Sequence, residues 1–373
     1  MMEILHCITT IRMGGAEKQL LTLVREQVKL GLKVTIVYLK DAPELKVAFQ
    51  KCGSTVIDEL ANKNIIFQLM WLKRFLKSKK IVVHAHLSRS ELFCAFCKGD
   101  NYLVITKHNT ERFFPRAPHL ISKKLARFVF SRANACITIS YAVKNYLEEI
   151  NEITKSIKTQ MIHYGTSLQT QVSTQEIDSL KSSLGIKKEY VLGTIARMVP
   201  QKNLSVLVKA FAIYNKRNDN SILILIGEGP LKSELYKLAK QLNIDRKIIW
   251  ISRTDKISQY LSILDVFILP SSYEGFGLVL LEAMQAGTPV IAANNSAIPE
   301  VMGKEYPGLY STDDVYKLVD MIVTSEDQNF RNMLSLQYQG RLSEFDSVKM
   351  AVKIIDSYER LTELEKSDRS LNG

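Results

Sequence analysis

The chain has 373 residues, a hydrophobic fraction of 46% and a formal net charge of +12. This length exceeds that of one ordinary domain and predicts two domains, each with a well-formed core. No apolar stretch is long enough to cross a bilayer, and the five cysteines are scattered, so a membrane-spanning protein and a small disulfide-rich protein are both excluded.

The positive charge is concentrated in the first half of the chain. Residues 1–170 contain 26 of the 50 Lys and Arg but only 13 of the 38 Asp and Glu. Such asymmetry is typical of contact with nucleic acid, an anionic membrane or an anionic substrate. No basic motif of RNA-binding type, with aromatic residues between the basic ones, accompanies it, so we expect no nucleic-acid partner.

The first residues already form an apolar, strand-like run, without the basic start and cleavage site of a signal peptide. This predicts a cytoplasmic protein. The pair Cys94-x-x-Cys97 lies in an apolar run and has no second Cys or His pair at metal-ligand spacing. We interpret both cysteines as core residues and expect no metal there.

Strand-like apolar runs alternate with helix-like segments along the whole chain. The predicted strands span residues 3–8, 33–39, 54–57, 81–85, 102–106 and 135–139, then 190–195, 222–226, 248–251, 266–269 and 290–293. Continuous Val, Ile and Leu runs between helices indicate parallel strands that are buried on both faces. The sequence therefore predicts an α/β fold with two Rossmann-like, doubly wound parallel-sheet domains facing across a cleft.

The most informative motif is Glu274-Gly-Phe-Gly-Leu-Val-Leu-Leu-Glu282, which follows the strand at 266–269 and precedes a helix ending at Gly287. The free amides and positive dipole at the start of that helix suit an anion such as a diphosphate. Eight residues at the helical rise separate the two carboxylates by roughly 12 Å. This spacing suits a ligand with hydroxyls at both ends and phosphates between them, which is a nucleotide sugar.

Two cations and a second glycine-rich turn follow neighbouring strands. Arg197 and Lys202 flank the turn after the strand at 190–195, where they can neutralise a leaving diphosphate; alternatively, they are exposed surface residues. Gly227 lies in a strand-to-helix turn that fits a loop lining a phosphate or a base. Because no convincing Asp-x-Asp cluster is present, we expect neither a metal ion nor any cofactor besides the donor substrate.

Four motifs in the second half resemble, in type and order, those of the family-4 glycosyltransferases, which are retaining enzymes of the GT-B fold. The resemblance extends over nearly the whole chain. The motifs are Ala-Arg-Met-Val-Pro-Gln-Lys-Asn at 196–203, Gly-Glu-Gly-Pro-Leu at 227–231, the stretch 269–284 that contains the two glutamates, and Ile-Pro-Glu at 298–300.

The resemblance assigns roles to these residues. It implies that Glu274 contacts the donor sugar, that Glu282 holds the ribose hydroxyls, and that Arg197 and Lys202 bind the diphosphate. The main-chain amides expected to meet the phosphate are those near Phe276, Gly277 and Leu278.

The first half matches the same family more loosely. The loop Gly14-Gly15-Ala-Glu resembles the family's Gly-Gly-x-Glu loop, which implies that its backbone approaches the donor phosphates or the acceptor. His84-Ala-His86 resembles the family's His-x-His strand end. Lys-His108-Asn resembles a segment with a histidine near the reacting sugar, which makes His108 a catalytic candidate. For each histidine the alternative is a residue that only forms hydrogen bonds, and this alternative is strongest for His84.

The sequence thus predicts a retaining transferase (EC 2.4) that moves a sugar from a nucleotide diphosphate, expected to be UDP, to an acceptor hydroxyl. Residues 1–170 would form the acceptor-side domain, residues 171–346 the nucleotide-sugar domain, and residues 347–373 a helix able to cross back to the first domain. The polar stretch 166–183 is the predicted linker. A nucleotide-sugar epimerase of similar architecture is the alternative; a dehydrogenase is disfavoured because no Gly-x-Gly-x-x-Gly follows the first strand.

The acceptor is predicted from charge. Two segments, residues 71–80 and 120–128, mix basic and apolar residues at roughly helical spacing. Such helices can lie on an anionic bilayer, which indicates peripheral attachment to the cytoplasmic membrane face and a lipid-linked or cell-envelope glycan acceptor, as in polysaccharide or lipopolysaccharide synthesis. Ordinary amphipathic helices with one buried side are the alternative.

Overall fold

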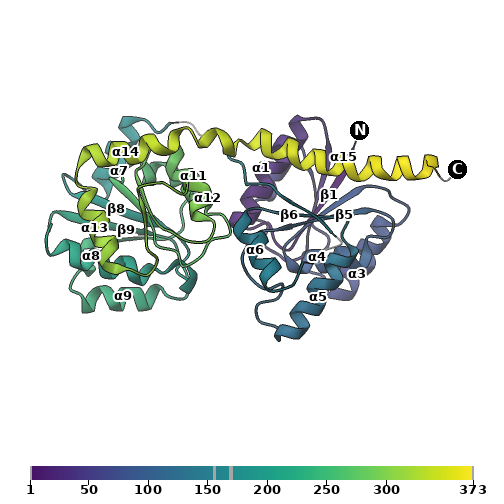
Figure 1. Ribbon diagram of the computed structural model, residues 1–373, viewed down its shortest axis with the longest axis horizontal. Coiled ribbons are helices and arrows are strands. Elements are labelled where there is room, and N and C mark those ends of the chain that lie inside the picture. Colours follow the sequence, from purple (N-terminus) through teal and green to yellow (C-terminus); the bar gives the residue numbers. More distant parts are fainter. Residues whose placement is uncertain (1, 154–156, 168–170, 372–373) are drawn as a thin grey trace. The chain divides into compact units, whose positions relative to one another are not determined.

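The computed structural model describes residues 2–153, 157–167 and 171–371, and the chain divides into two compact units (Figure 1). The first unit combines Met1–Ser167 with Phe345–Gly373, and the second is Leu168–Glu344. Each unit contains one parallel β-sheet with helices on both faces. The prediction of two Rossmann-like α/β sheets is therefore confirmed.

The sheet of the first unit has the strand order β3-β2-β1-β4-β5-β6-β7. Its strands are β1 (Glu3–Ile8), β2 (Lys33–Tyr38), β3 (Thr55–Ile57), β4 (Val82–His86), β5 (Tyr102–Lys107), β6 (Ala135–Thr138) and β7 (Lys158–Met161). Its helices are α1 (Gly15–Lys29), α2 (Lys46–Lys51), α3 (Ile65–Leu76), α4 (Ser88–Cys97), α5 (His119–Arg132), α6 (Tyr141–Glu149) and α15 (Ser347–Leu371). The strand order reverses between β1 and β4, so the chain leaves these two strands toward opposite faces of the sheet.

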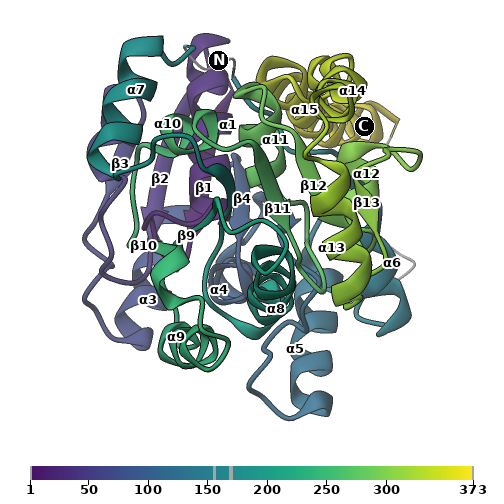
Figure 2. The same cartoon turned by 90° about the vertical axis from the view of Figure 1, so that its left-hand side faces the viewer.

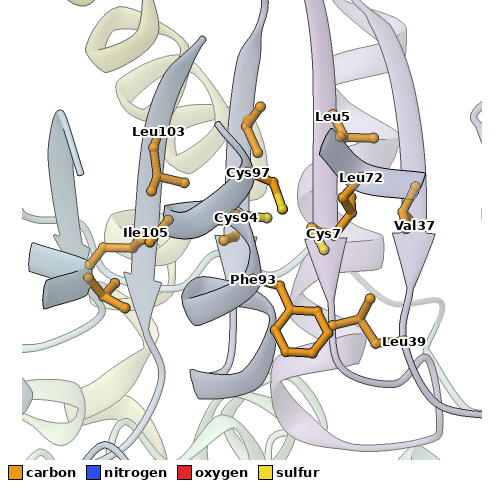
Figure 3. Packing of buried hydrophobic residues seen from close by; sticks show 14 of the residues in the cluster. Leu5, Cys7, Val37, Leu39, Leu72, Phe93, Cys94, Cys97, Leu103 and Ile105 are labelled. Carbon is orange, nitrogen blue, oxygen red and sulfur yellow. The ribbon is translucent and has the colours of Figure 1, made fainter. Parts of the chain in front are cut away.

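Each face of this sheet has its own core, because successive side chains of a strand point to opposite faces. One face is apolar and packs against α3, α4 and α5. Figure 3 shows this core, with Leu5, Cys7, Val37, Leu39, Leu103 and Ile105 from the strand side and Leu72, Phe93, Cys94 and Cys97 from the helices. Cys94 and Cys97 are buried core residues, as predicted. The opposite face combines a second apolar cluster, which includes Ile8, Val34 and Ile36, with buried histidines.

Helix α15 belongs to the first unit, where it packs beside α1. Its buried side consists of Met350, Ala351, Ile354 and Tyr358, which recur at helical spacing. Tyr358, which is late in the chain, is thereby buried against His84 of β4.

The sheet of the second unit has the order β10-β9-β8-β11-β12-β13 (Figure 2). Its strands are β8 (Tyr190–Ile195), β9 (Ser221–Ile226), β10 (Ile248–Ile251), β11 (Val266–Leu269), β12 (Val290–Ala293) and β13 (Leu309–Tyr310). Helices α8 (Leu204–Asn215), α9 (Lys232–Gln241) and α13 (Val315–Thr324) cover one face. The other face holds α7 (Thr174–Ser183), α10 (Ile257–Ser262), α11 (Leu278–Gln285), α12 (Ile298–Met302) and α14 (Gln328–Gln339).

The structure adds two strands and corrects one prediction about the chain's organisation. The sequence pattern does not reveal the edge strands β7 and β13, because β7 has the polar sequence Lys-Thr-Gln-Met and β13 has only two residues. The predicted linker is helical over α7. Ser173 Oγ accepts from the Glu176 amide, and the Glu176 carboxylate accepts from the Ser173 amide in return, so a capping box starts the helix.

Candidate functional site

The order of the second sheet reverses between β8 and β11, and the loops after these strands meet there. Lys202 ends a short 3₁₀ turn after β8, and Glu274 lies in the loop after β11. Lys202 Nζ is 2.5 Å from Glu274 Oε1, and the exposed fractions of the two side chains are only 15% and 6%. The fold thus joins two of the predicted site residues, 72 positions apart, in a largely buried ion pair at the switch point.

Hydrogen bonds from neighbouring loops hold Glu274 in place. Ser271 Oγ donates to Glu274 Oε1 at 2.7 Å, and Ser296 Oγ donates to the Glu274 carbonyl at 2.7 Å. Asn295 Nδ2 donates to the Ser271 carbonyl at 3.2 Å. The loops after β11 and β12 therefore fix the carboxylate before any ligand arrives, which is the arrangement expected of a preorganised binding group.

The turn from β11 into α11 brings the backbone of this loop to the same place. Phe276 is buried, and Gly277 has a φ of 89°, a left-handed conformation that glycine adopts readily. Helix α11 begins at Leu278 without a side-chain cap, so its first amides point out of the helix. Glu282 lies one turn further along, half-buried. The strand-to-helix turn thus lies where the sequence places it, and its role in binding an anion stays a prediction.

Arg197 and Gly227 lie on the adjoining turns after β8 and β9. The Arg197 side chain is exposed, unlike that of Lys202. Gly227 has a φ of 137°, and a Cβ at this position would lie 2.0 Å from the carbonyl oxygen of Ala196. The Met198 amide donates to the Glu228 carbonyl at 2.8 Å. The glycine is thus needed where the two turns pack together, a structural requirement that exists without a ligand.

In the first unit, Gly14 and Gly15 form the start of α1 after β1, with Gly14 at the N-cap. A Cβ on Gly14 would lie 2.3 Å from Glu17 Oε2. Thr10 Oγ1 donates to Glu17 Oε1 at 2.7 Å, and this carboxylate also lies near the helix start, where the dipole favours it. The missing side chain at Gly14 therefore leaves room for the Glu17 carboxylate.

His108 follows the end of β5, and hydrogen bonds occupy both of its ring nitrogens. Its Nε2 is 3.1 Å from His86 Nδ1, and its Nδ1 bonds to the Tyr164 hydroxyl. Burial, together with the nearby positive charge of Lys107, lowers the pKa of His108 to about 3. His108 is therefore a neutral imidazole at physiological pH.

The histidines of β1 and β4 extend this contact into the sheet. His6 Nδ1 is 3.0 Å from His86 Nε2, and His84 Nδ1 is 2.6 Å from the Tyr358 hydroxyl. Burial lowers the pKa of His6 to about 4, although its bond with Gln27 opposes the shift. Burial also holds the pKa values of His84 and His86 well below their usual range. His84 is fully buried with a hydrogen bond at each ring nitrogen, which favours the alternative of a residue that only forms hydrogen bonds.

Sequence reasoning missed His6, Gln27, Tyr164 and Tyr358 in this network. A signal for His6 exists, since β1 pairs with β4 so that His6 lies opposite His84 on the same face. A polar residue in an otherwise apolar, two-sided strand indicates a buried partner. No pattern near Tyr358 indicates its contact with a strand 274 residues away.

The two segments predicted to lie on a membrane differ in exposure. Residues 120–128 expose Leu120 (71%) and Ile121 (51%), whereas residues 71–80 bury Leu72 and Leu76. Helix α3 begins earlier than predicted, and its exposed Ile66 (71%) and Met70 (68%) precede the predicted segment. Exposed basic residues lie nearby on the same helices: Lys73, Arg74, Lys124 and Arg127. Among the described residues, no helix is both long enough and apolar enough to span a bilayer.

Comparisons with known proteins cover both units. Residues 13–169 match the model of the family described as Glycosyltransferase Family 4, and residues 176–335 match that of Glycosyl transferases group 1. The chain is 27% identical over 290 residues to the N-acetyl-alpha-D-glucosaminyl L-malate synthase of Bacillus anthracis, covering 75% of this chain and 74% of the relative. It is 28% identical over 309 residues to the UDP-Gal:alpha-D-GlcNAc-diphosphoundecaprenol alpha-1,3-galactosyltransferase of Escherichia coli, covering 78% of each.

Solved structures share the fold. The HepE protein of Anabaena, crystallised in complex with UDP and glucose, matches with a TM-score of 0.83 and 20% identity, covering 96% of this chain and 99% of HepE. The TarM structure matches with a TM-score of 0.78 and 13% identity, covering 96% of this chain and 99% of TarM.

Proposed function

The chain belongs to the family-4 glycosyltransferases and transfers sugar from a nucleotide-sugar donor, and from this premise we propose a UDP-sugar donor, retention of anomeric configuration and a lipid-linked or cell-envelope glycan acceptor. The observation that carries the proposal is the Lys202–Glu274 pair beside the start of α11, because it collects a cation, a carboxylate and free helix amides at one switch point.

In the proposed mechanism, Lys202, Arg197 and the amides of Gly277 and Leu278 bind the diphosphate. They stabilise the negative charge that develops as the bond from the anomeric carbon to the phosphate oxygen breaks. Glu274 contacts the donor sugar. The acceptor hydroxyl attacks on the face that the diphosphate leaves, and the departing phosphate oxygen takes its proton. In these steps the positive charges of Lys202 and Arg197, and not a metal ion, offset the negative charge of the diphosphate.

The remaining candidates complete the donor site in the proposal. Glu282 accepts hydrogen bonds from the ribose hydroxyls, and the turn at Gly227 lines the base or phosphates. In the first unit, Gly14 and Gly15 offer main-chain amides to the donor phosphates or to the acceptor. His108 contacts the reacting sugar as a neutral imidazole.

The choice of UDP rests on relatives. HepE was crystallised with UDP, and the galactosyltransferase of E. coli is named for a UDP-sugar. A GDP-sugar is the second candidate, because a mannosyltransferase of Mycobacterium tuberculosis that is 31% identical over 162 residues is named as GDP-mannose-dependent.

We expect UDP and UDP-sugars to raise the melting temperature of the second unit. A ligand that binds only the folded state at a hundred times its Kd stabilises it by about 2.7 kcal/mol. Trp250 is the only tryptophan in residues 168–344, so its fluorescence in a Trp71→Phe variant reports this unit. Stabilisation by GDP compounds alone would replace UDP in the proposal. Epimerised sugar formed without any acceptor would favour the epimerase.

We expect the first unit to bind anionic vesicles through α3 and α5. Vesicles containing phosphatidylglycerol should bind more protein than phosphatidylcholine vesicles, and less as salt rises, because each basic residue near the surface contributes about 1 kcal/mol. Lys124→Gln with Arg127→Gln should weaken binding, whereas Lys232→Gln with Lys237→Gln in the second unit is the matched control. Equal binding to both vesicles at low salt would remove the charge argument for a lipid-linked acceptor.

A further inference from the structure

A chain of hydrogen bonds runs through the first unit from Gln27 in α1 to Tyr164. Gln27 Oε1 is 2.8 Å from His6 Nε2, His6 Nδ1 is 3.0 Å from His86 Nε2, and His86 Nδ1 is 3.1 Å from His108 Nε2. His108 Nδ1 then bonds to the Tyr164 hydroxyl. We call Gln27, His6, His86, His108 and Tyr164 the histidine chain. Its three imidazoles come from β1, β4 and the end of β5, and His6 and His86 lie on the same face of the sheet.

The histidine chain has a direction, because a neutral imidazole donates through one nitrogen and accepts through the other. The Gln27 carbonyl oxygen can only accept, so His6 carries its hydrogen on Nε2 and accepts at Nδ1. His86 must therefore donate from Nε2 and accept at Nδ1. The same reasoning places the hydrogen of His108 on Nε2. The lowered pKa values of these histidines keep each ring neutral, so each has one donor and one acceptor nitrogen.

A second branch holds the amide of Gln27. Gln27 Nε2 donates to the Tyr358 hydroxyl at 3.3 Å, that hydroxyl is 2.6 Å from His84 Nδ1, and His84 Nε2 is 2.6 Å from Thr106 Oγ1. Exchanging the oxygen and nitrogen of the Gln27 amide would exchange donor and acceptor in every hydrogen bond of both branches. Gln27 is therefore the junction at which the direction of the histidine chain is set.

We propose that Gln27 is a positioning residue that fixes His108 as its Nε2–H tautomer, so that Nδ1 of His108 is the acceptor presented at the end of the histidine chain. The consequence of this inference rests on the proposed function. A sugar hydroxyl that reaches His108 would donate its hydrogen to Nδ1 and so replace the Tyr164 hydroxyl as the donor. His108 then orients the sugar without acting as an acid.

The metal alternative starts from the same residues. Ring nitrogens of His6, His84 and His86 lie within 4.8 Å of one another, which is close enough to consider a cation. However, both nitrogens of each ring already have hydrogen-bond partners in the protein, and all three side chains are buried. A cation would have to displace several of these bonds, so the geometry favours the histidine chain.

The direct test is the tautomer of His108, read from long-range proton–nitrogen spectra of the whole protein with nitrogen-15 histidine. We expect Nε2–H for His6, His86 and His108. In Gln27→Met, which keeps the length of the side chain but removes both the carbonyl oxygen and the NH2 of the amide, His108 should become a mixture of tautomers. Thr106→Val is the matched control: it removes one buried hydrogen bond at the far end of the other branch and should leave His108 unchanged.

Three results would overturn the proposal: wild-type His108 protonated on Nδ1, an unchanged tautomer in Gln27→Met, or equal disturbance by Thr106→Val. Zinc or cobalt that shifts the signals of His6, His84 and His86 would establish a metal site instead. The wild-type spectrum decides even if a variant does not fold.

Activity supplies a separate measurement. Gln27→Met should lower kcat up to about tenfold, the effect of one misdirected hydrogen bond, and leave UDP affinity unchanged, since the proposed nucleotide site lies in the second unit. Wild-type protein that neither binds nor uses nucleotide sugars would defeat the proposed function while the tautomer result stands.

Discussion

Lowering the pH from 7 to 5 should destabilise the first unit by several kcal/mol. In the folded protein His6, His84, His86 and His108 stay neutral, because burial depresses their pKa values, to about 4 for His6 and about 3 for His108. In the unfolded chain each titrates near pH 6.5. Below that pH the unfolded state binds more protons, so stability falls as pH decreases until the folded pKa values are reached. The loss is roughly 2 kcal/mol per histidine at pH 5, and less in sum if the rings relax together.

The sequence supplies the reporter for this experiment. All six histidines lie within residues 6–163, and the second unit has none. A Trp250→Phe variant leaves Trp71 as the only tryptophan and so follows the first unit alone. Urea midpoints from its fluorescence should fall between pH 7 and 5, whereas Trp71→Phe measures the second unit as the control. A midpoint reported by Trp71 that stays constant over this range would contradict the prediction.

Replacing the two motif glutamates should separate sugar recognition from nucleotide binding. Glu282→Ala should weaken the binding of UDP and of the UDP-sugar alike, by about ten- to a hundredfold in Kd, because a charged hydrogen bond contributes roughly 1.5–3 kcal/mol. Glu274→Ala should lower turnover by a similar factor while free UDP still binds nearly normally. Calorimetry with UDP and kinetics with the donor sugar measure the two effects.

The Lys202–Glu274 pair requires a careful control. Glu274→Ala leaves the lysine ammonium largely buried without this partner, which can destabilise the unit by itself. Glu274→Gln keeps an oxygen that can accept from Ser271 and is the matched variant, and Glu305→Gln is an exposed control in the same unit. Melting curves must first show that each variant folds. A folded Glu274→Gln protein with full activity, or a folded Glu282→Ala protein with unchanged UDP affinity, would mean that the motif has another role.

Most strands could be predicted because buried parallel strands are runs of Val, Ile and Leu between helices. β1, β8, β10, β11 and β12 begin and end at the predicted residues. The strands β7 and β13 could not be found this way, since an edge strand buries less surface and needs fewer apolar residues. Local hydrophobic pattern thus identifies the centre of a sheet better than its edges.

The site shows a similar division. The positions of Lys202 and Glu274 follow from motifs, but their ion pair depends on how two distant loops meet after β8 and β11. For His108, sequence similarity indicates a role but not which ring nitrogen carries the hydrogen. That depends on its bonds to His86 and Tyr164, which the sequence does not show. Hydrogen-bond direction and burial are properties of the assembled sheet.

The placement of α15 also determines the order in which the protein can be completed on the ribosome. The second unit is whole once residue 344 has left the exit tunnel, whereas the first unit still lacks its last helix. Until Tyr358 arrives, Gln27 Nε2 and His84 Nδ1 lack the hydroxyl that they contact in the folded unit, so the earliest part of the chain to be synthesised is the last to reach its final state. A nascent chain stalled before residue 345 should therefore contain a finished second unit and an unfinished first unit that chaperones can still recognise.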